Sequence, residues 1–448
     1  MDLRERRLYY NRCKPEEALG PEDERNLDVD RFGTVRVRGI NWVDRLAEPV
    51  ELSTDPVLLL FSGLRGSGKS TELLRLSQRL SHPRGANLLP VYIDALEILD
   101  TAGTVDIPDI IASVVHSAEE CLLRAEGKDA AQALQEGYLT RLWTWLTRTG
   151  IDPKQAEYSI PGGLKLILEM KTRPTLRQRV RSVIAAYLTA FLEDARKELN
   201  RLNDRAVRLG HAGLAVIFDS LEKLRGTSTN WGEVLDSAER VFAGGAPYLR
   251  LPVHVIYTVP PALLGRCIEH VEFIPMIKLR ERDGSPYPPG IASARELIRK
   301  RVPDAALEKL LGRKAEDRLK ELIMWSGGYP REIIRLLRRI LEVPKPPLSK
   351  ADFQRLWDEL CDEYRKFVPE DAFPWLARVA SEQYLAIRTE ADRQVADLML
   401  NNNAVLRYLN ENDWFDLHPA VREIPGVQAA LQPAPEMGFR GSPGDEGG

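Results

Sequence analysis

A glycine-rich stretch with one lysine and one serine is the part of this chain best suited to chemistry. Residues 63–70 read Gly-Leu-Arg-Gly-Ser-Gly-Lys-Ser and directly follow the apolar run of residues 57–61. Glycines permit backbone torsions that a side chain forbids, so successive N–H groups can line a nest for an anion where a helix begins. Lys69 would then reach the outer phosphates of a nucleoside triphosphate, and the Ser70 hydroxyl would ligate Mg²⁺. The flanking strand and helix patterns favour this phosphate-binding loop over a chance glycine-rich turn.

The contacts with bound ATP would come from the whole loop and from the first turn of the helix that follows it. The expected nucleotide-binding residues of this segment are Gly63, Arg65, Gly66, Ser67, Gly68, Lys69, Ser70 and Thr71.

Two acids at the end of another strand are candidates for handling Mg²⁺ and water. Asp219 ends the most apolar run of the chain, residues 213–219. An acid there can help to hold Mg²⁺ together with Ser70, whereas the alternative is a cap of the next helix. Glu222 follows three positions later and is a candidate base that orients the attacking water. Its alternative is a first-turn carboxylate favoured by the helix dipole.

A threonine and an arginine complete the candidate catalytic set. Thr258 ends the strand predicted over residues 253–258, where its side chain could sense the terminal phosphate or hold the lytic water. Pro330, a further expected nucleotide-binding residue, suits the first turn of a helix, and Arg331 beside it would project near the phosphates. Arg301 is either an arginine finger that acts on another subunit or a surface charge, and the surface interpretation is slightly favoured.

Alternating strands and helices must position these residues. The alternation predicts an α/β fold with a doubly wound parallel sheet, since strands separated by helical segments pair in parallel. An insertion near residues 126–175 interrupts it, with a helix expected over 130–149 and a strand over 162–170. The other expected strands cover residues 57–61, 88–94, 213–219, 253–258 and 273–279, and the expected helices include 107–125 and 177–209.

The remaining segments predict a chain of several units. Residues 1–55 form an irregular lead-in with a short helix near Trp42, and residues 56–290 form the α/β core. Residues 291–343 are almost entirely helical and would form a lid. In residues 349–425, helices over 350–367 and 390–400 precede a strand, a turn and a strand, which predicts a winged helix. The Pro-, Gly- and acid-rich residues 433–448 predict a disordered tail.

Composition restricts the classes of function. The 448 residues suffice for two or three domains. A formal net charge of −3 gives no overall attraction to nucleic acid or to an anionic membrane. No apolar run reaches the length of a membrane span, and the charged N-terminus is unlike a signal peptide. The cysteines are scattered, which argues against a zinc site and a disulfide framework and favours a cytoplasmic location.

The order of these motifs resembles the AAA+ and STAND P-loop ATPases. The resemblance covers roughly residues 55–425 and includes origin-recognition ATPases, which pair an AAA+ core with a C-terminal winged helix. Gly328-Tyr329-Pro330 matches the Gly-x-Pro motif of the STAND lid, and Asp219 matches the Walker B position. The sequence Asp-Ser-Leu-Glu at 219–222 departs from the adjacent acid pair of AAA+ enzymes and is closer to the KAP-type pattern. STAND proteins are signal-transduction switches, and in bacteria they often act in defence systems.

The sequence is compatible with three functions. The leading hypothesis is an ATP-binding switch whose nucleotide state controls self-association or a protein partner, with slow hydrolysis to reset it. The alternative is an ATP-dependent DNA loader or transposition-type regulator that uses the winged helix. The many acids in residues 349–371 disfavour DNA as a partner, with only Arg388, Arg393 and Arg407 available for phosphates. A metabolic kinase is the third and weakest hypothesis.

Overall fold

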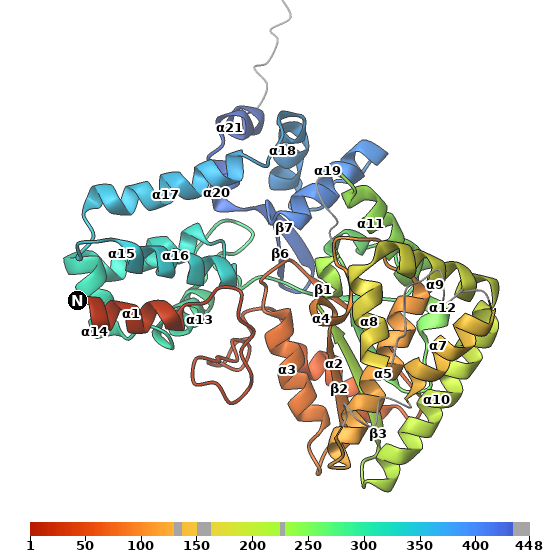
Figure 1. The fold of residues 1–448 in the computed structure, drawn as a ribbon. Coiled ribbons are helices and arrows are strands. Elements are labelled where there is room, and N and C mark those ends of the chain that lie inside the picture. The colour runs from red at the N-terminus through yellow and green to blue at the C-terminus, as the bar shows by residue number, and fades with distance from the viewer. Residues whose placement is uncertain (130–136, 150–162, 225–228, 433–448) are drawn as a thin grey trace, which may run out of the picture.

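A parallel β-sheet forms the centre of the α/β part of the molecule. The structure is a computed structural model that describes residues 1–129, 137–149, 163–224 and 229–432. Within these residues the sheet has five parallel strands in the order β2-β3-β4-β1-β5 (Figure 1). The strands are β1 (Leu58–Gly63), β2 (Leu88–Asp94), β3 (Gly213–Asp219), β4 (His254–Thr258) and β5 (Val271–Ile274). The predicted α/β class and parallel sheet are confirmed.

The register of the sheet gathers the candidate residues at one edge. Asp94 pairs with Asp219, and Phe61 pairs with Thr258. Because the strands are parallel, their carboxyl ends lie at the same edge, where the glycine loop (residues 63–70) also begins. The last strand differs from the prediction over 273–279, since β5 ends at Ile274. Pro275 follows and has no N–H to donate to a neighbouring strand.

Helices cover both faces of the sheet, which is why β3 is apolar along its whole length and buried at every residue. On one face α2 and α3 pack through Leu46, Leu73 and Leu76 against strand residues that include Ile217. The opposite face is covered by α5, α10 and α11. The helices of the core are α2 (Trp42–Leu52), α3 (Lys69–Leu80), α4 (Ala95–Ile98), α5 (Ile107–Ala125), α10 (Leu188–Arg208), α11 (Trp231–Glu239) and α12 (Ala246–Leu249).

The segment that follows α5 corrects two predictions. The strand expected over 162–170 is wrong, because residues 163–172 form helix α8 (Gly163–Thr172), which packs against α5, α7 (Tyr138–Thr149) and α9 (Pro174–Ala186). The long helix expected over 177–209 is two helices, α9 and α10, because the backbone of Tyr187 leaves the helical region (φ −129°, ψ 30°). Of the helix expected over 130–149, residues 138–149 are helical and 130–136 lie outside the described residues.

The C-terminal half is helical up to a hairpin. The α13–α16 layer, expected as the lid, contains α13 (Pro288–Arg299), α14 (Asp304–Leu311), α15 (Ala315–Trp325) and α16 (Pro330–Glu342). The C-terminal unit (residues 349–432) contains α17 (Lys350–Arg365), α18 (Phe373–Glu382), α19 (Glu390–Asn401), β6 (Val405–Leu409), β7 (Asp413–Leu417), α20 (Pro419–Arg422) and α21 (Pro425–Leu431). Strand β6 pairs antiparallel with β7, so the helices and hairpin expected here are present, with α18 in addition. One continuous core joins this unit to the α13–α16 layer.

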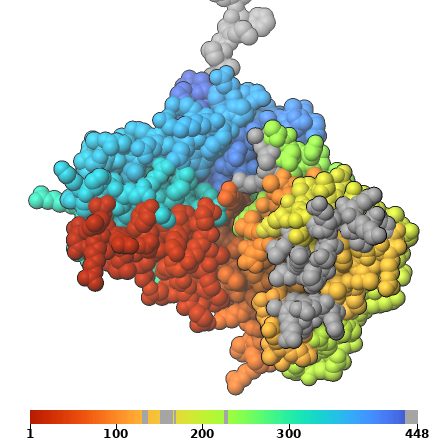
Figure 2. Space-filling model, in the orientation of Figure 1, coloured from red at the N-terminus to blue at the C-terminus, as the bar shows by residue number. Residues whose placement is uncertain are grey.

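The N-terminal segment is more structured than the predicted lead-in. Helix α1 (Leu3–Arg12) packs on α16, where the Arg6 guanidinium donates to the Leu341 carbonyl and the Arg338 guanidinium lies 3.9 Å from the centre of the Tyr10 ring. Figure 2 shows this segment, in red, on the surface beside the α13–α16 layer. Among the described residues, no helix has the length and apolar character to cross a bilayer. The tail predicted as disordered, 433–448, lies outside the described residues.

Candidate functional site

The glycine loop has the backbone conformation that its sequence predicts. Gly66 (φ 80°) and Gly68 (φ 101°) adopt left-handed torsions, and α3 begins immediately afterwards at Lys69. A Cβ atom on Gly66 would lie 2.6 Å from the Cβ of Arg331 and 2.7 Å from the Tyr329 ring. Glycine is therefore required at position 66 both for its torsion and for the close approach of the α16 end.

Lys69 is buried at the centre of the site, with 3% of its surface exposed. Its ammonium donates to the carbonyl oxygens of Gly63 at 2.8 Å and Leu64 at 3.1 Å, and it lies 3.4 Å from Oε1 of Glu222. Burial lowers the pKa of Lys69, and the charges of Glu222 and Asp219 oppose that shift. The predicted lysine and the candidate base are thus direct neighbours.

Asp219 is held by three donors at the end of β3. Its Oδ2 accepts a 2.6 Å hydrogen bond from the Tyr92 hydroxyl, and its Oδ1 accepts one from the Ser220 N–H at 2.6 Å. The hydroxyl of Ser70 also bonds to this carboxylate. Burial raises the pKa of Asp219, and the charge of Glu222 raises it further. Hydroxyl and carboxylate oxygens are the ligands that Mg²⁺ prefers, so the predicted Ser70–Asp219 pair has suitable chemistry for that ion.

Glu222 lies in a tight turn after β3. The turn needs a left-handed residue, Ser220 (φ 67°), and continues as the short helix η2 (Leu221–Lys223). Burial would raise the pKa of Glu222, but Lys69 and the hydrogen-bond donors around it outweigh burial, and the net pKa is lowered. The carboxylate is therefore the favoured form at neutral pH.

Thr258 differs from its predicted placement. Its Oγ1 accepts a 2.9 Å hydrogen bond from the Leu221 N–H and donates to the Phe218 carbonyl at 3.3 Å. The side chain is fully buried and is not part of the cavity wall. Thr258 therefore fixes the turn that carries Glu222 instead of facing a phosphate.

A cavity of about 380 Å³ lies against the glycine loop. Its polar end contains Lys69, Ser70 and Asp219, together with the other loop residues predicted to bind nucleotide from Arg65 to Thr71. Gly63 lies behind this wall and not in it, since a Cβ there would be 2.4 Å from Ile274. Most apolar side chains of the cavity come from the N-terminal segment and the α13–α16 layer, and α3 and α4 add one leucine each: Leu19, Leu27, Val29, Leu297, Ile334, Leu74 and Leu96.

Residues 15–38 form a cavity wall that sequence reasoning missed. Arg38 is 1% exposed, and its guanidinium bonds to Asp30 at 2.5 Å and to Glu72 of α3 at 2.7 Å. Arg75 adds a 2.8 Å bond to the same Glu72. These buried pairs fasten the N-terminal segment to the helix that starts at the glycine loop.

Two arginines of the α13–α16 layer, Arg301 and Arg331, line the cavity. Pro330 is the first residue of α16, and Arg331 lines the cavity with its Nε donating to the Pro15 carbonyl at 3.2 Å. The surface interpretation of Arg301 is wrong, because this residue is only 6% exposed and also lines the cavity. Glu16 pairs with Arg331 at 3.1 Å and with Arg65 at 3.8 Å.

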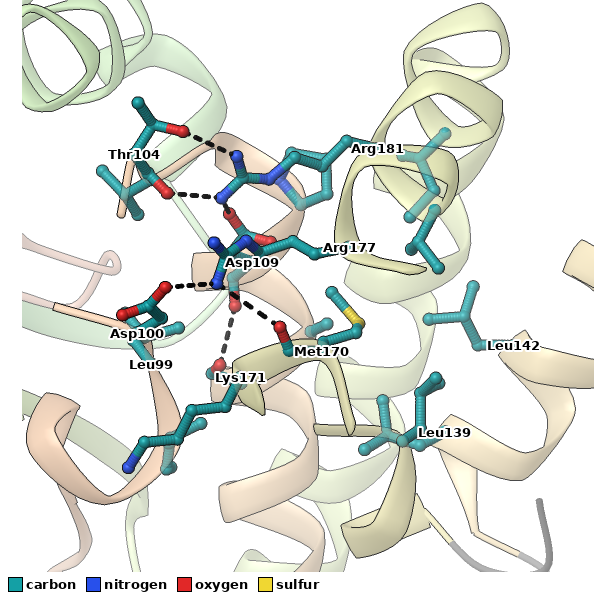
Figure 3. Close-up of a pocket in the computed structure, with 18 residues that line it drawn as sticks. Leu99, Asp100, Thr104, Asp109, Leu139, Leu142, Met170, Lys171, Arg177 and Arg181 are labelled. Atoms are coloured by element: carbon teal, nitrogen blue, oxygen red, sulfur yellow. Dashed lines mark hydrogen bonds and ion pairs between the residues drawn. The ribbon is translucent and has the colours of Figure 1, made fainter. Parts of the chain in front are cut away.

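A second pocket lies away from the glycine loop, among α5, α7, α8 and α9 (Figure 3). Its volume is about 30 Å³, which is the space of one water molecule. Figure 3 shows Arg177 reaching Asp100, and Arg181 reaching Asp109 and Thr104, above apolar walls that include Leu142. Internal ion pairs and small size make this pocket a packing feature, so the cavity at the glycine loop is the candidate site.

Comparison with known proteins adds little to this geometry. The sequence matches no family model and no curated protein. Among solved structures, Cdc6p from Pyrobaculum aerophilum aligns with 94% of this chain and 97% of its own, with a TM-score of 0.35 and 10% identity. A likeness of this size does not identify a family, so an assignment of function depends on the site itself.

Proposed function

We propose that this protein is a nucleotide-dependent switch of the AAA+/STAND type that binds ATP with Mg²⁺ at the glycine loop. The N–H groups of the loop would bind the phosphates, and Lys69 would exchange its bonds to main-chain carbonyls for bonds to phosphate oxygens. The apolar residues of the N-terminal segment and the α13–α16 layer would cover the base. The 380 Å³ cavity between them is large enough for a nucleotide-sized ligand.

The two acids Asp219 and Glu222 would support slow hydrolysis of ATP. Ser70 and Asp219 would hold Mg²⁺, which neutralises charge on the phosphates when bound. Glu222 would orient the attacking water, and Thr258 would keep its turn in place through the Leu221 N–H. Arg331 would contact the phosphates from the first turn of α16.

A contact between the glycine loop and the C-terminal unit is the observation that carries the switch. The side-chain amide of Asn403, just after α19, donates a 3.0 Å hydrogen bond to the Arg65 carbonyl in the loop. The Tyr408 hydroxyl on β6 donates a 2.6 Å bond to the Gly327 carbonyl, just before α16. The α13–α16 layer would act as the lid and residues 349–425 as a winged-helix-type domain. Any rearrangement of the loop or the lid on nucleotide binding would therefore change these contacts of the C-terminal unit.

The charges of the C-terminal unit favour a protein partner or self-association over DNA. Arg388 pairs with Glu382 at 2.5 Å, Arg393 with Glu390 at 3.7 Å, and Arg407 with Asp413. A basic surface for DNA requires arginines that are free to reach phosphates. A role in bacterial defence or signalling stays part of the proposal and has support only from the resemblance of the motifs.

The proposal is tested by nucleotide binding and by mass. Calorimetry with ATP and Mg²⁺ should show binding by the wild-type protein, strong loss with Lys69→Ala, and no change with Lys320→Ala, an exposed lysine on α15. Size-exclusion mass measurement should differ between ADP and a non-hydrolysable ATP analogue. Wild-type affinity and turnover in Lys69→Ala would refute the nucleotide site, and equal masses in both nucleotides would refute control of self-association.

A further inference from the structure

Arg301 is a buried cation without an acidic partner. It follows α13 and is 6% exposed. Its Nη1 donates to the carbonyl oxygens of Leu297 at 2.9 Å and Arg25 at 3.4 Å. Among the described residues no carboxylate forms an ion pair with it, in contrast to Arg38, which binds both Asp30 and Glu72.

Arg301 lines the cavity and has donors that no described residue uses. Its Nε and Nη2 make no hydrogen bond to any residue that the structure describes. Neither atom is completely buried, and the residue is part of the cavity wall. Burial lowers the pKa of Arg301 to about 10, so the guanidinium stays charged at neutral pH. A buried charge is costly unless it meets a partner, so a ligand that brings acceptor atoms to this position would gain affinity.

The surroundings of Arg301 place it away from the phosphate end of the cavity. The charged groups that act most strongly on Lys69 are Glu222, Asp219 and Arg331. Those that act on Arg301 belong to a different set: Arg25, Asp23 and Glu17. Its hydrogen-bonded neighbour Leu297 is one of the apolar wall residues, which we assign to the base.

We propose that Arg301 binds the nucleoside part of the ligand, donating hydrogen bonds to acceptor atoms of the base or ribose. This inference depends on the proposed function, because it assumes that the cavity takes a nucleotide. A guanidinium has donors only, so its counterpart must be a ring nitrogen, a carbonyl oxygen or a ribose oxygen. Arg301 would then select a complete nucleotide over a bare phosphate chain.

The experiment compares wild-type protein with Arg301→Met, which replaces the cation by an apolar side chain, and Arg301→Lys, which keeps the charge but loses the planar fork. Arg338→Met is the matched control, because Arg338 also bonds to a main-chain carbonyl, that of Cys13, but does not line the cavity. Calorimetric affinities are measured for ATP, ribose 5-triphosphate and tripolyphosphate, and thermal unfolding verifies that each variant is folded.

The expected result is a loss of ATP affinity of roughly tenfold to a hundredfold in Arg301→Met, the effect of a hydrogen bond to a charged group. Tripolyphosphate affinity should be unchanged. A loss with ATP but not with ribose 5-triphosphate assigns the contact to the base, and a loss with both assigns it to the ribose.

Two results would overturn the inference while leaving the proposed function intact. One is unchanged ATP affinity in Arg301→Met, and the other is an equal loss for tripolyphosphate, which would move Arg301 to the phosphates. A wild-type protein that binds no ATP would overturn the proposed function and this inference with it.

Discussion

The hydroxyl of Tyr92 on β2 donates a 2.6 Å hydrogen bond to Oδ2 of Asp219 at the end of the adjacent strand β3. The two strands are paired along their whole length, from Leu88 with Gly213 to Asp94 with Asp219. The hydroxyl therefore reaches the carboxylate from a rigid neighbour and fixes one of its oxygens. This bond favours the charged form of Asp219, because a donor stabilises a carboxylate.

Tyr92→Phe should weaken the binding of Mg²⁺ to the site without removing nucleotide binding. Loss of a hydrogen bond to a charged group costs about 1.5–3 kcal/mol, so the Mg²⁺ concentration that gives half-maximal ATPase turnover should rise roughly tenfold. Affinity for nucleotide in EDTA should stay near the wild-type value. Tyr257→Phe is the control, because Tyr257 is buried on β4 and its hydroxyl points to the Leu249 carbonyl. An unchanged Mg²⁺ requirement would exclude a positioning role for Tyr92.

Two glycines of the loop, with Gly85 beyond α3 as a reference, separate the effect of backbone torsion from that of steric contact. Gly66→Ala forces a Cβ to within 2.6 Å of Arg331 and also a left-handed torsion, whereas Gly68→Ala incurs the torsion alone, since its nearest atom is 3.8 Å away. We expect Gly68→Ala to cost about 1 kcal/mol of unfolding free energy and Gly66→Ala to cost more. Gly85→Ala, with no left-handed torsion and its nearest contact at 3.5 Å, should be near neutral. Urea denaturation measures all three, and equal effects at Gly66 and Gly68 would contradict this view of the loop.

The predictions from sequence succeeded where burial is uniform. The expected strand over 213–219 and helix over 107–125 coincide with β3 and α5, because the first is buried on both faces and the second presents a wide apolar stripe. The apolar run at residues 162–170 was predicted to be a strand, but residues 163–172 form helix α8. A short apolar run cannot be separated from a buried helix by its period, and packing against α7 and α9 decided the outcome.

The N-terminal wall of the cavity could not be predicted in the same way. Asp30 and Arg38 lie in a segment without helical or strand period, and the second carboxylate that Arg38 binds, Glu72, is 34 positions beyond it. No local pattern indicates that such charges meet. The guanidinium of Arg335 on α16 likewise pairs with Glu332 at 2.8 Å and with Glu363 of the C-terminal unit, 28 positions on, at 2.7 Å. Contacts between distant segments, and not composition, decide these positions.

Asn403→Asp should loosen the C-terminal unit from the glycine loop. The substitution preserves size and tolerates the left-handed torsion of this residue (φ 54°), but it replaces the donor to the Arg65 carbonyl by a carboxylate oxygen. We expect faster dissociation of a fluorescent ADP analogue in stopped-flow measurements, by several-fold, and faster hydrogen exchange in β6. Asn402→Asp is the neighbouring control. If ADP dissociation and exchange both stay at wild-type values, the loop and the C-terminal unit are not coupled through this contact.

His418 should make the stability of the C-terminal unit sensitive to acid. It is fully buried, stacks on Tyr364 with ring centres 4.1 Å apart, and its Nδ1 accepts the Ala420 N–H at the start of α20. Burial lowers the pKa of His418 to about 3, with the charges of Arg335 and Arg280 acting in the same direction. The unfolded chain therefore binds this proton near pH 6.5 and the folded chain does not.

The stabilisation from neutral His418 is complete above pH 6.5 and is lost as the pH falls below it, by up to about 1.4 kcal/mol per pH unit. In His418→Asn, which can still cap α20, the free energy of unfolding should be lower at pH 7.5 but should fall less steeply towards pH 5.5. Other buried groups titrate in both proteins, Asp30 among them with a pKa raised by burial to about 6, so the difference between the two urea curves isolates His418. Parallel pH profiles would mean that the pKa of His418 is the same in the folded and the unfolded protein, which its burial argues against.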